Sequence, residues 1–312
     1  MKTKHFLLSA LIVLVGTPFA EAQTSMRDIQ NQASQPLGGL PDSIKKPWTI
    51  GGLVTLNFAQ GSSSNWSAGA QDFSMSLNSV DNFFAVYKKG RNRWDNTFQA
   101  NYGFTQTTEQ GLQKTSDLLD LTSKYGYQLD SSKWSLSALF DYRSQFTNGY
   151  NYYKSVTGKD SNQLISGFNA PAYILLSPGF QYTPVAYFSI FLSPVSSRWV
   201  VCTNRALAPN YGIDTGKTST YMLGAYASIT YNHQLFKNVG YNGRLDLYSN
   251  YLKNPQNINV YMTNQLIMKI NKVLSATYSL SIIYDNTEHR PDGTAWGTQL
   301  QSLLGIGLAV KI

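Results

Sequence analysis

Strict alternation between apolar and polar side chains over long stretches is the feature that most constrains how this chain can fold. In residues 240–251, for example, Leu245 and Leu247 occupy one set of alternate positions, and Arg244 and Asp246 occupy the other. A helix would mix these two sets around its surface, whereas a β-strand places them on opposite faces. The same alternation recurs in residues 94–105 and 274–285. The chain is therefore expected to be all-β.

About twelve segments with this pattern follow one another along the chain, and an even number suits a closed antiparallel barrel. They far exceed the roughly five to six residues of ordinary strands. A soluble β-sandwich, the main alternative, does not explain strands of this length that each carry an apolar face. The expected strands are residues 48–60, 69–88, 93–107, 116–129, 132–149, 171–183, 186–203, 218–234, 238–254, 257–270, 273–288 and 298–311.

Composition indicates that this barrel crosses a membrane. Charged residues make up 13% of the chain, against about 25% in a typical soluble domain, and aromatic residues reach 13%. No apolar run approaches the ~20 residues that a membrane-spanning helix needs. Trp48, Tyr87 and Trp94 collect near short turns, as in the aromatic girdles of membrane barrels. We therefore expect residues 47–312 to form a transmembrane antiparallel up-and-down β-barrel.

The N-terminal residues predict export from the cytoplasm. The basic residues Lys2 and Lys4 precede an apolar stretch at residues 6–15, and a small-residue cleavage site follows at residues 20–22. This three-part pattern predicts a signal peptide over residues 1–22. Residues 23–46 are polar and without periodicity, which favours a flexible periplasmic segment before the barrel. The predicted location is the cell outer membrane.

Connector lengths predict how the barrel is oriented. Most links after odd-numbered strands are long, and the longest spans about residues 150–170, whereas links such as Asn271-Lys272 are very short. The link at Pro255-Gln256 is the exception, since it follows an odd-numbered strand and is short. In bacterial barrels the short turns face the periplasm and the long loops face outward.

A set of charged residues falls on the face expected to line the lumen, and it supplies the candidate site. These residues are Asp95, Asp120, Lys124, Asp141, Arg143, Arg244, Asp246 and Asp285. One interpretation is structural, because paired charges can fill a narrow barrel and unpaired ones would be costly in a low-dielectric lumen. The other is a constriction that selects solutes. A barrel of about twelve strands lies between filled small barrels and open porins, so both stay open.

The sequence gives no support for an enzyme. His233 and His289 are expected at opposite ends of the barrel, and a catalytic triad needs its groups within hydrogen-bond reach. An outer-membrane hydrolase that uses His289 with Asp285 or Asp292 is the weak alternative. No catalytic, cofactor-binding or metal-binding residue is therefore predicted, and no cofactor is expected.

Several short segments resemble an uncharacterised outer-membrane β-barrel family of the Bacteroidetes, catalogued only as a domain of unknown function. The resemblance covers roughly residues 48–312 and implies an outer-membrane barrel, with no activity or catalytic residue to carry over. The segments that carry it are Tyr87–Gly90, Leu121–Tyr127, Phe191–Pro194, Tyr248–Asn257 and Met268–Lys272.

The function expected from these features is a narrow pore for small solutes or a structural barrel. A partner-binding subunit of an outer-membrane complex is the alternative. Expected partners are outer-membrane lipid and lipopolysaccharide, the barrel-assembly machinery and a further outer-membrane protein. The net charge of +8 does not predict nucleic-acid binding, because basic residues gather at turns such as residues 88–93, where they suit lipid phosphates.

Overall fold

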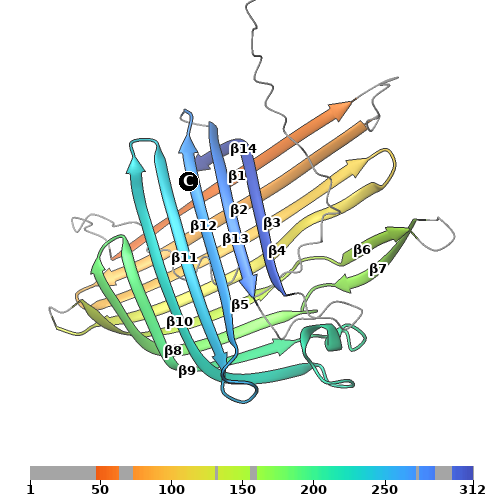
Figure 1. Ribbon diagram of the computed structural model, residues 1–312. Coiled ribbons are helices and arrows are strands. Elements are labelled where there is room, and N and C mark those ends of the chain that lie inside the picture. The colour runs from red at the N-terminus through yellow and green to blue at the C-terminus, as the bar shows by residue number, and fades with distance from the viewer. Residues whose placement is uncertain are drawn as a thin grey trace, which may run out of the picture.

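A computed structural model describes residues 47–62, 73–130, 133–154, 160–271, 274–284 and 297–311 (Figure 1). The predicted signal peptide over residues 1–22, the predicted segment 23–46 and the candidate residue Asp285 lie outside these ranges. So does His289. Among the described residues, no helix has the length and apolar character needed to cross a membrane.

Twelve long strands form a closed antiparallel barrel, which confirms the predicted fold class. Each strand pairs with the next one along the chain, except that β6 and β7 form a separate two-stranded hairpin between β5 and β8. A short ladder between β1 and β14, from Leu53 opposite Lys311 to Leu56 opposite Leu308, closes the barrel. The strands are β1 (Trp48–Ser62), β2 (Phe73–Lys89), β3 (Asn92–Thr107), β4 (Gly111–Gln128), β5 (Trp134–Ser144), β6 (Gly149–Lys154), β7 (Asp160–Ser166), β8 (Ala172–Val185), β9 (Phe188–Val201), β10 (Ser219–Phe236), β11 (Val239–Asn250), β12 (Ile258–Lys269), β13 (Leu274–Tyr284) and β14 (Thr298–Lys311).

Side-chain alternation gives the wall two different faces. In β5, Leu136 and Phe140 are 51% and 38% exposed on the outside, whereas Leu139 and Asp141, at the intervening positions, are 3% and 0% exposed. A period of two residues is the geometry of a strand, so one row faces the lumen and the other faces away. The outer row is apolar, as a surface in contact with lipid requires.

Strand β5 ends earlier than the sequence predicted, at Ser144 instead of residue 149. The carboxylate of Asp117 on β4 accepts hydrogen bonds from the backbone N–H groups of Phe146 and Thr147, at 2.7 and 2.8 Å. A side chain thus satisfies backbone donors that a longer strand would have paired in the ladder. The chain is thereby free to leave the barrel wall.

The segment that follows contains structure that the sequence analysis did not predict. Residues 150–170 were expected to be the longest loop, but most of this region forms the hairpin of β6 and β7, which projects from the barrel (Figure 1). Its polar and tyrosine-rich sequence hid the strands, because the alternation of apolar residues is weak there. Tyr150 and Tyr152 share one face, with ring centroids 6.4 Å apart.

The link between β11 and β12 also differs from expectation. The predicted strands left only Pro255-Gln256 between them, whereas β11 ends at Asn250 and β12 begins at Ile258. The Ser249 hydroxyl donates to the Pro255 carbonyl oxygen at 2.6 Å, and Asn254 takes a positive φ of 52°, so these residues form a turn. The apparent exception to the pattern of long and short links therefore disappears.

A cluster of buried apolar residues in the described part of the chain extends from the lumen into the loop between β9 and β10. That loop contains a 3₁₀ helix, η1 (Ala208–Tyr211), and its residues Cys202, Ala208 and Ile213 are 0%, 0% and 2% exposed. They join the same cluster as Tyr173 and Met222 on the inner face of the wall. The Tyr211 hydroxyl donates to the Ile165 carbonyl oxygen at 2.6 Å, which ties the loop to the hairpin. The residues of this loop therefore pack against the inner face of β8–β10 at this end of the lumen.

Candidate functional site

The inner face of the barrel has two contrasting halves. Away from the short turns, the inward rows of β5 and β8–β11 are almost entirely buried, and we call these rows the packed half. Leu175 and Ser177 on β8, for example, are 1% and 0% exposed. On β1–β3 and the second part of β12 most inward residues are partly exposed, although Val86 and Gln99 are buried, and we call these rows the open half. Asn78, Thr97 and Asn101 belong to it.

Three of the candidate charges meet where β4 joins the packed half. Asp120, Asp141 and Arg143 are 1%, 0% and 0% exposed. Asp120 lies directly opposite Arg143 in the ladder between β4 and β5. The Thr122 hydroxyl lies 2.6 Å from the Asp141 carboxylate and 3.2 Å from that of Asp120, within hydrogen-bond distance of both. Two carboxylates, a guanidinium and a hydroxyl are thus enclosed together away from water.

Arg244 and Asp246 form a second buried group with Tyr226. The guanidinium of Arg244 makes an ion pair with Asp246, on the same inward row of β11. Its Nη2 atom donates to the Tyr226 hydroxyl at 2.8 Å, and that hydroxyl donates to Asp246 Oδ1 at 2.9 Å. All three residues are at most 5% exposed. The tyrosine therefore links the two charges into a closed triangle, which removes part of the cost of burying them.

The remaining two described candidates lie nearer the short turns. Asp95 and Lys124 are opposite each other in the ladder between β3 and β4. Asp95 is held by Arg93, whose Nε atom lies 2.9 Å from both carboxylate oxygens. The seven described candidates therefore separate into the Asp120 group, the Arg244 group and this pair. Asp285 lies outside the described residues.

Arg198 on β9 is a buried lumen cation that the sequence analysis missed. It is 1% exposed, and its guanidinium carbon lies 5.6 Å from the ring centroid of Tyr173 and 5.7 Å from that of Tyr248. Cation–π contacts of this kind stabilise a desolvated cation. Tyr173 comes from β8 and Tyr248 from β11, so Arg198 joins strands that are not neighbours.

A β-bulge explains why simple alternation did not reveal Arg198. Between Ser193 and Ser196, β9 has two residues where β10 has only one between Gly224 and Tyr226. The extra residue moves the inward row from odd to even numbers along β9. Pro194, which has no backbone N–H to donate, lies in the bulge and was the one signal that could have indicated it.

No metal centre is evident in the ranges that the structure describes, where no group of three or more His, Cys, Asp and Glu residues is placed to hold an ion. His233 is exposed, and its ring centroid lies 4.6 Å from that of Tyr187 at a short turn. The chemistry available in the lumen is therefore that of buried charges, hydroxyl groups and aromatic rings.

This closed antiparallel wall, with an apolar outer row and a charged lumen, defines the membrane type of β-barrel. Residues 58–150 match the model of a family described as "Protein of unknown function (DUF3078)". This match agrees with the predicted domain of unknown function. No curated protein has a significant sequence match to the chain.

The chain also aligns with solved structures at low sequence identity. The translocator domain of autotransporter NalP from Neisseria meningitidis aligns with a TM-score of 0.43 and 9% identity, covering 86% of this chain and 89% of that one. The COG4313 outer membrane channel from Pseudomonas putida F1 gives 0.42 and 11%, covering 88% and 97%. The NanC porin gives 0.41 and 8%, covering 82% and 98%.

Proposed function

We propose that this protein is an outer-membrane barrel that admits small polar solutes along the open half of its lumen. The observation that supports the proposal is the contrast between the two halves. Asn78, Thr97 and Asn101 are partly exposed although they face inward, whereas the inward residues of β5 and β8–β11 are mostly buried away from the short turns. Small neutral polar side chains in contact with water are what a narrow solute path requires.

The outer surface of the barrel supports a membrane location. Leu176, Phe180 and Leu192 are 45%, 46% and 44% exposed, although such side chains would be costly to leave in water. At the short-turn end, Trp48 packs against Tyr87 and Trp94, with ring centroids 5.2 and 5.9 Å apart. Aromatic clusters of this kind favour the water–lipid interface. Lipid and lipopolysaccharide are therefore the proposed contacts of the outer wall.

Orientation can be tested by cysteine labelling on intact cells. A cysteine at Ser161, in the projecting hairpin, should react with a membrane-impermeant maleimide, and a cysteine at Asn271, in a short turn, should not. The native Cys202 is 0% exposed, so the unmodified protein should give no signal and serves as the blank. Labelling at Asn271 without labelling at Ser161 would invert the proposed orientation.

The solute path can be tested by conductance in planar lipid bilayers. Asn101→Trp places a bulky ring in the open half and should at least halve the single-channel conductance of the purified barrel. Ala100→Trp, one residue earlier, points toward lipid and should leave conductance unchanged, because alternate residues occupy opposite faces. A folded wild-type barrel that conducts no ions would contradict the proposal and favour a purely structural barrel.

A further inference from the structure

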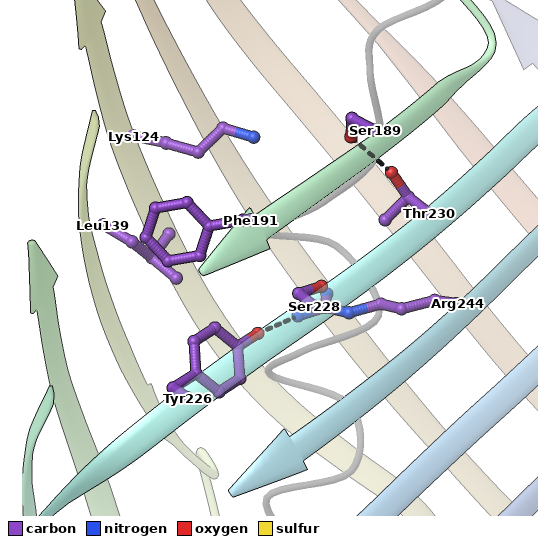
Figure 2. A pocket seen from close by; sticks show the side chains of 8 residues that line it. All are labelled: Lys124, Leu139, Ser189, Phe191, Tyr226, Ser228, Thr230 and Arg244. Atoms are coloured by element: carbon purple, nitrogen blue, oxygen red, sulfur yellow. Dashed lines mark hydrogen bonds between the residues drawn. The ribbon is translucent and has the colours of Figure 1, made fainter. Parts of the chain in front are cut away.

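The pocket within the packed half is too small to hold a solute. Figure 2 shows this pocket between β4, β5, β9, β10 and β11, where it has room for little more than about one water molecule. Side chains around it hold one another in place. Ser189 and Thr230 have their hydroxyl oxygens 2.7 Å apart, and Arg244 donates to Tyr226 at 2.8 Å. A solute that crosses the barrel is therefore expected to contact the open half.

The buried charges of the lumen are separated from the open half by neutral residues. On one ladder row, Thr122 lies between Asp141 and Thr97. On the next row, Gln99 lies beside Asp120. Each of the six buried charges in the lists for the described residues of these rows is at most 5% exposed, and the set balances, with three arginines and three aspartates. They are Asp120, Asp141, Arg143, Arg198, Arg244 and Asp246.

The open half offers hydrogen-bonding groups without charge. On β1–β3, from Asp95 toward the long loops, the described inward side chains that follow carry no charge. Their polar groups are hydroxyls and amides, which supply both donors and acceptors. The Asn101 oxygen accepts from the Gln99 amide at 3.1 Å, and this contact turns the amide donors of Asn101 away from Gln99. The partly exposed members are Asn57, Ser76, Asn78, Thr97, Asn101 and Thr105.

An aromatic ring belongs to the same inward rows. Phe84 is partly exposed, and its ladder partners are Gly51 on β1 and Thr97 on β3. Gly51 has no side chain and Thr97 has a small one, so neither partner is large enough to cover the ring. The face of an aromatic ring carries partial negative charge and attracts C–H groups. A ring beside hydroxyl and amide groups suits a solute that has C–H groups on one face and hydroxyl groups at its edge.

We infer that the open half binds uncharged, polyhydroxylated solutes of sugar size, with Phe84 against the solute ring and with Thr97 and Asn101 at its hydroxyl groups. The inference rests on the proposed solute path and names the class of solute that uses it. Hydroxyl groups of the solute exchange hydrogen bonds to water for equivalent ones to the wall. A charged solute loses hydration there without meeting an opposite charge, which is costly.

Swelling of proteoliposomes tests the solute class with the wild-type barrel. Liposomes that contain the purified protein are diluted into iso-osmotic glucose, glucosamine hydrochloride or sodium gluconate, which share a six-carbon frame and differ in charge. Glucose should enter about fivefold faster, or more, than either charged solute. Equal entry of all three would overturn the inference and leave the solute path standing. Entry of none would contradict the solute path itself, and the inference with it.

A matched pair of variants tests the role of the ring. In planar bilayers, maltose should reduce the ion current of the wild-type barrel. Phe84→Ala should raise the maltose concentration that halves the current by about fivefold, while the ion current persists and shows that the variant is folded. Phe83 lies on the lipid face, with its ring centroid 6.4 Å from that of Phe98, so Phe83→Ala should block as the wild type does. Wild-type current that is insensitive to maltose, or an unchanged response in Phe84→Ala, would overturn the inference.

Discussion

Replacing Arg143 by alanine is expected to lower the free energy of unfolding of the barrel by about 3–5 kcal/mol. The side chain is 0% exposed, opposite Asp120 and on the same inward row as Asp141. Its removal leaves two carboxylates in a region that water does not reach. Urea-induced unfolding in lipid vesicles, followed by tryptophan fluorescence, measures the effect.

The control for this experiment is an exposed arginine of the same barrel. Arg91 pairs with Asp130 at 3.0 Å, but their side chains are 52% and 85% exposed. Exposed ion pairs contribute about 0–1 kcal/mol to stability, so Arg91→Ala should change the free energy of unfolding very little. Similar small losses for both variants would mean that water reaches Arg143 and that the packed half is in fact open.

Leu245→Arg is expected to destabilise the barrel by about 2–4 kcal/mol, the cost of a cation at the bilayer midplane on the lipid face. Leu245 lies midway along β11, and its partners in the neighbouring ladders are the apolar residues Ile229 and Met262. The folded and unfolded forms of such a barrel migrate differently on gels. The variant should therefore convert to the unfolded band at a lower temperature than the wild-type protein.

Asn242→Arg is the matched control on the same strand. Asn242 belongs to the inward row and lies near the short turn, opposite Gln265. A new cation there meets polar groups and water, so the effect should be small. If the two variants shifted the transition equally, the assignment of inner and outer faces on β11 would be wrong.

The barrel itself could be predicted because the alternation of apolar and polar residues shows both where a strand lies and which of its side chains face inward. Alternation at Leu245 and Arg244 identifies a strand whatever its partners are, and long strands with apolar outer rows have few architectures available. Strand ends were harder. The early end of β5 depends on Asp117, which is distant in sequence from the backbone groups that it binds, and no local pattern reports such a contact.

The lumen could be predicted only in part. Inward charges such as Asp120 and Arg143 follow from alternation, but which of them meet depends on register between strands and on the bulk of their neighbours. From the sequence alone, the inward charges could either fill the lumen as paired groups or form a constriction that selects solutes. Large inward residues on β8–β11, including Tyr226 and Tyr248, fill one side, whereas Asn, Thr and Ser leave the other side accessible to water.

The bulge at Ser193–Ser196 determines which residues of β9 face the lumen and which face lipid. Up to Ser193 the odd-numbered residues of β9 face inward, and from Ser196 onward the even-numbered ones do. Loss of one of the two bulge residues, Pro194 or Val195, would restore a regular ladder and keep Arg198 facing inward. Loss of Ser197, beyond the bulge, would instead exchange the two rows, exposing Arg198 to lipid and turning Trp199 inward. Turns can gain or lose residues without this penalty. Between Ser196 and Val201, therefore, substitution of a residue is tolerated more easily than its insertion or deletion.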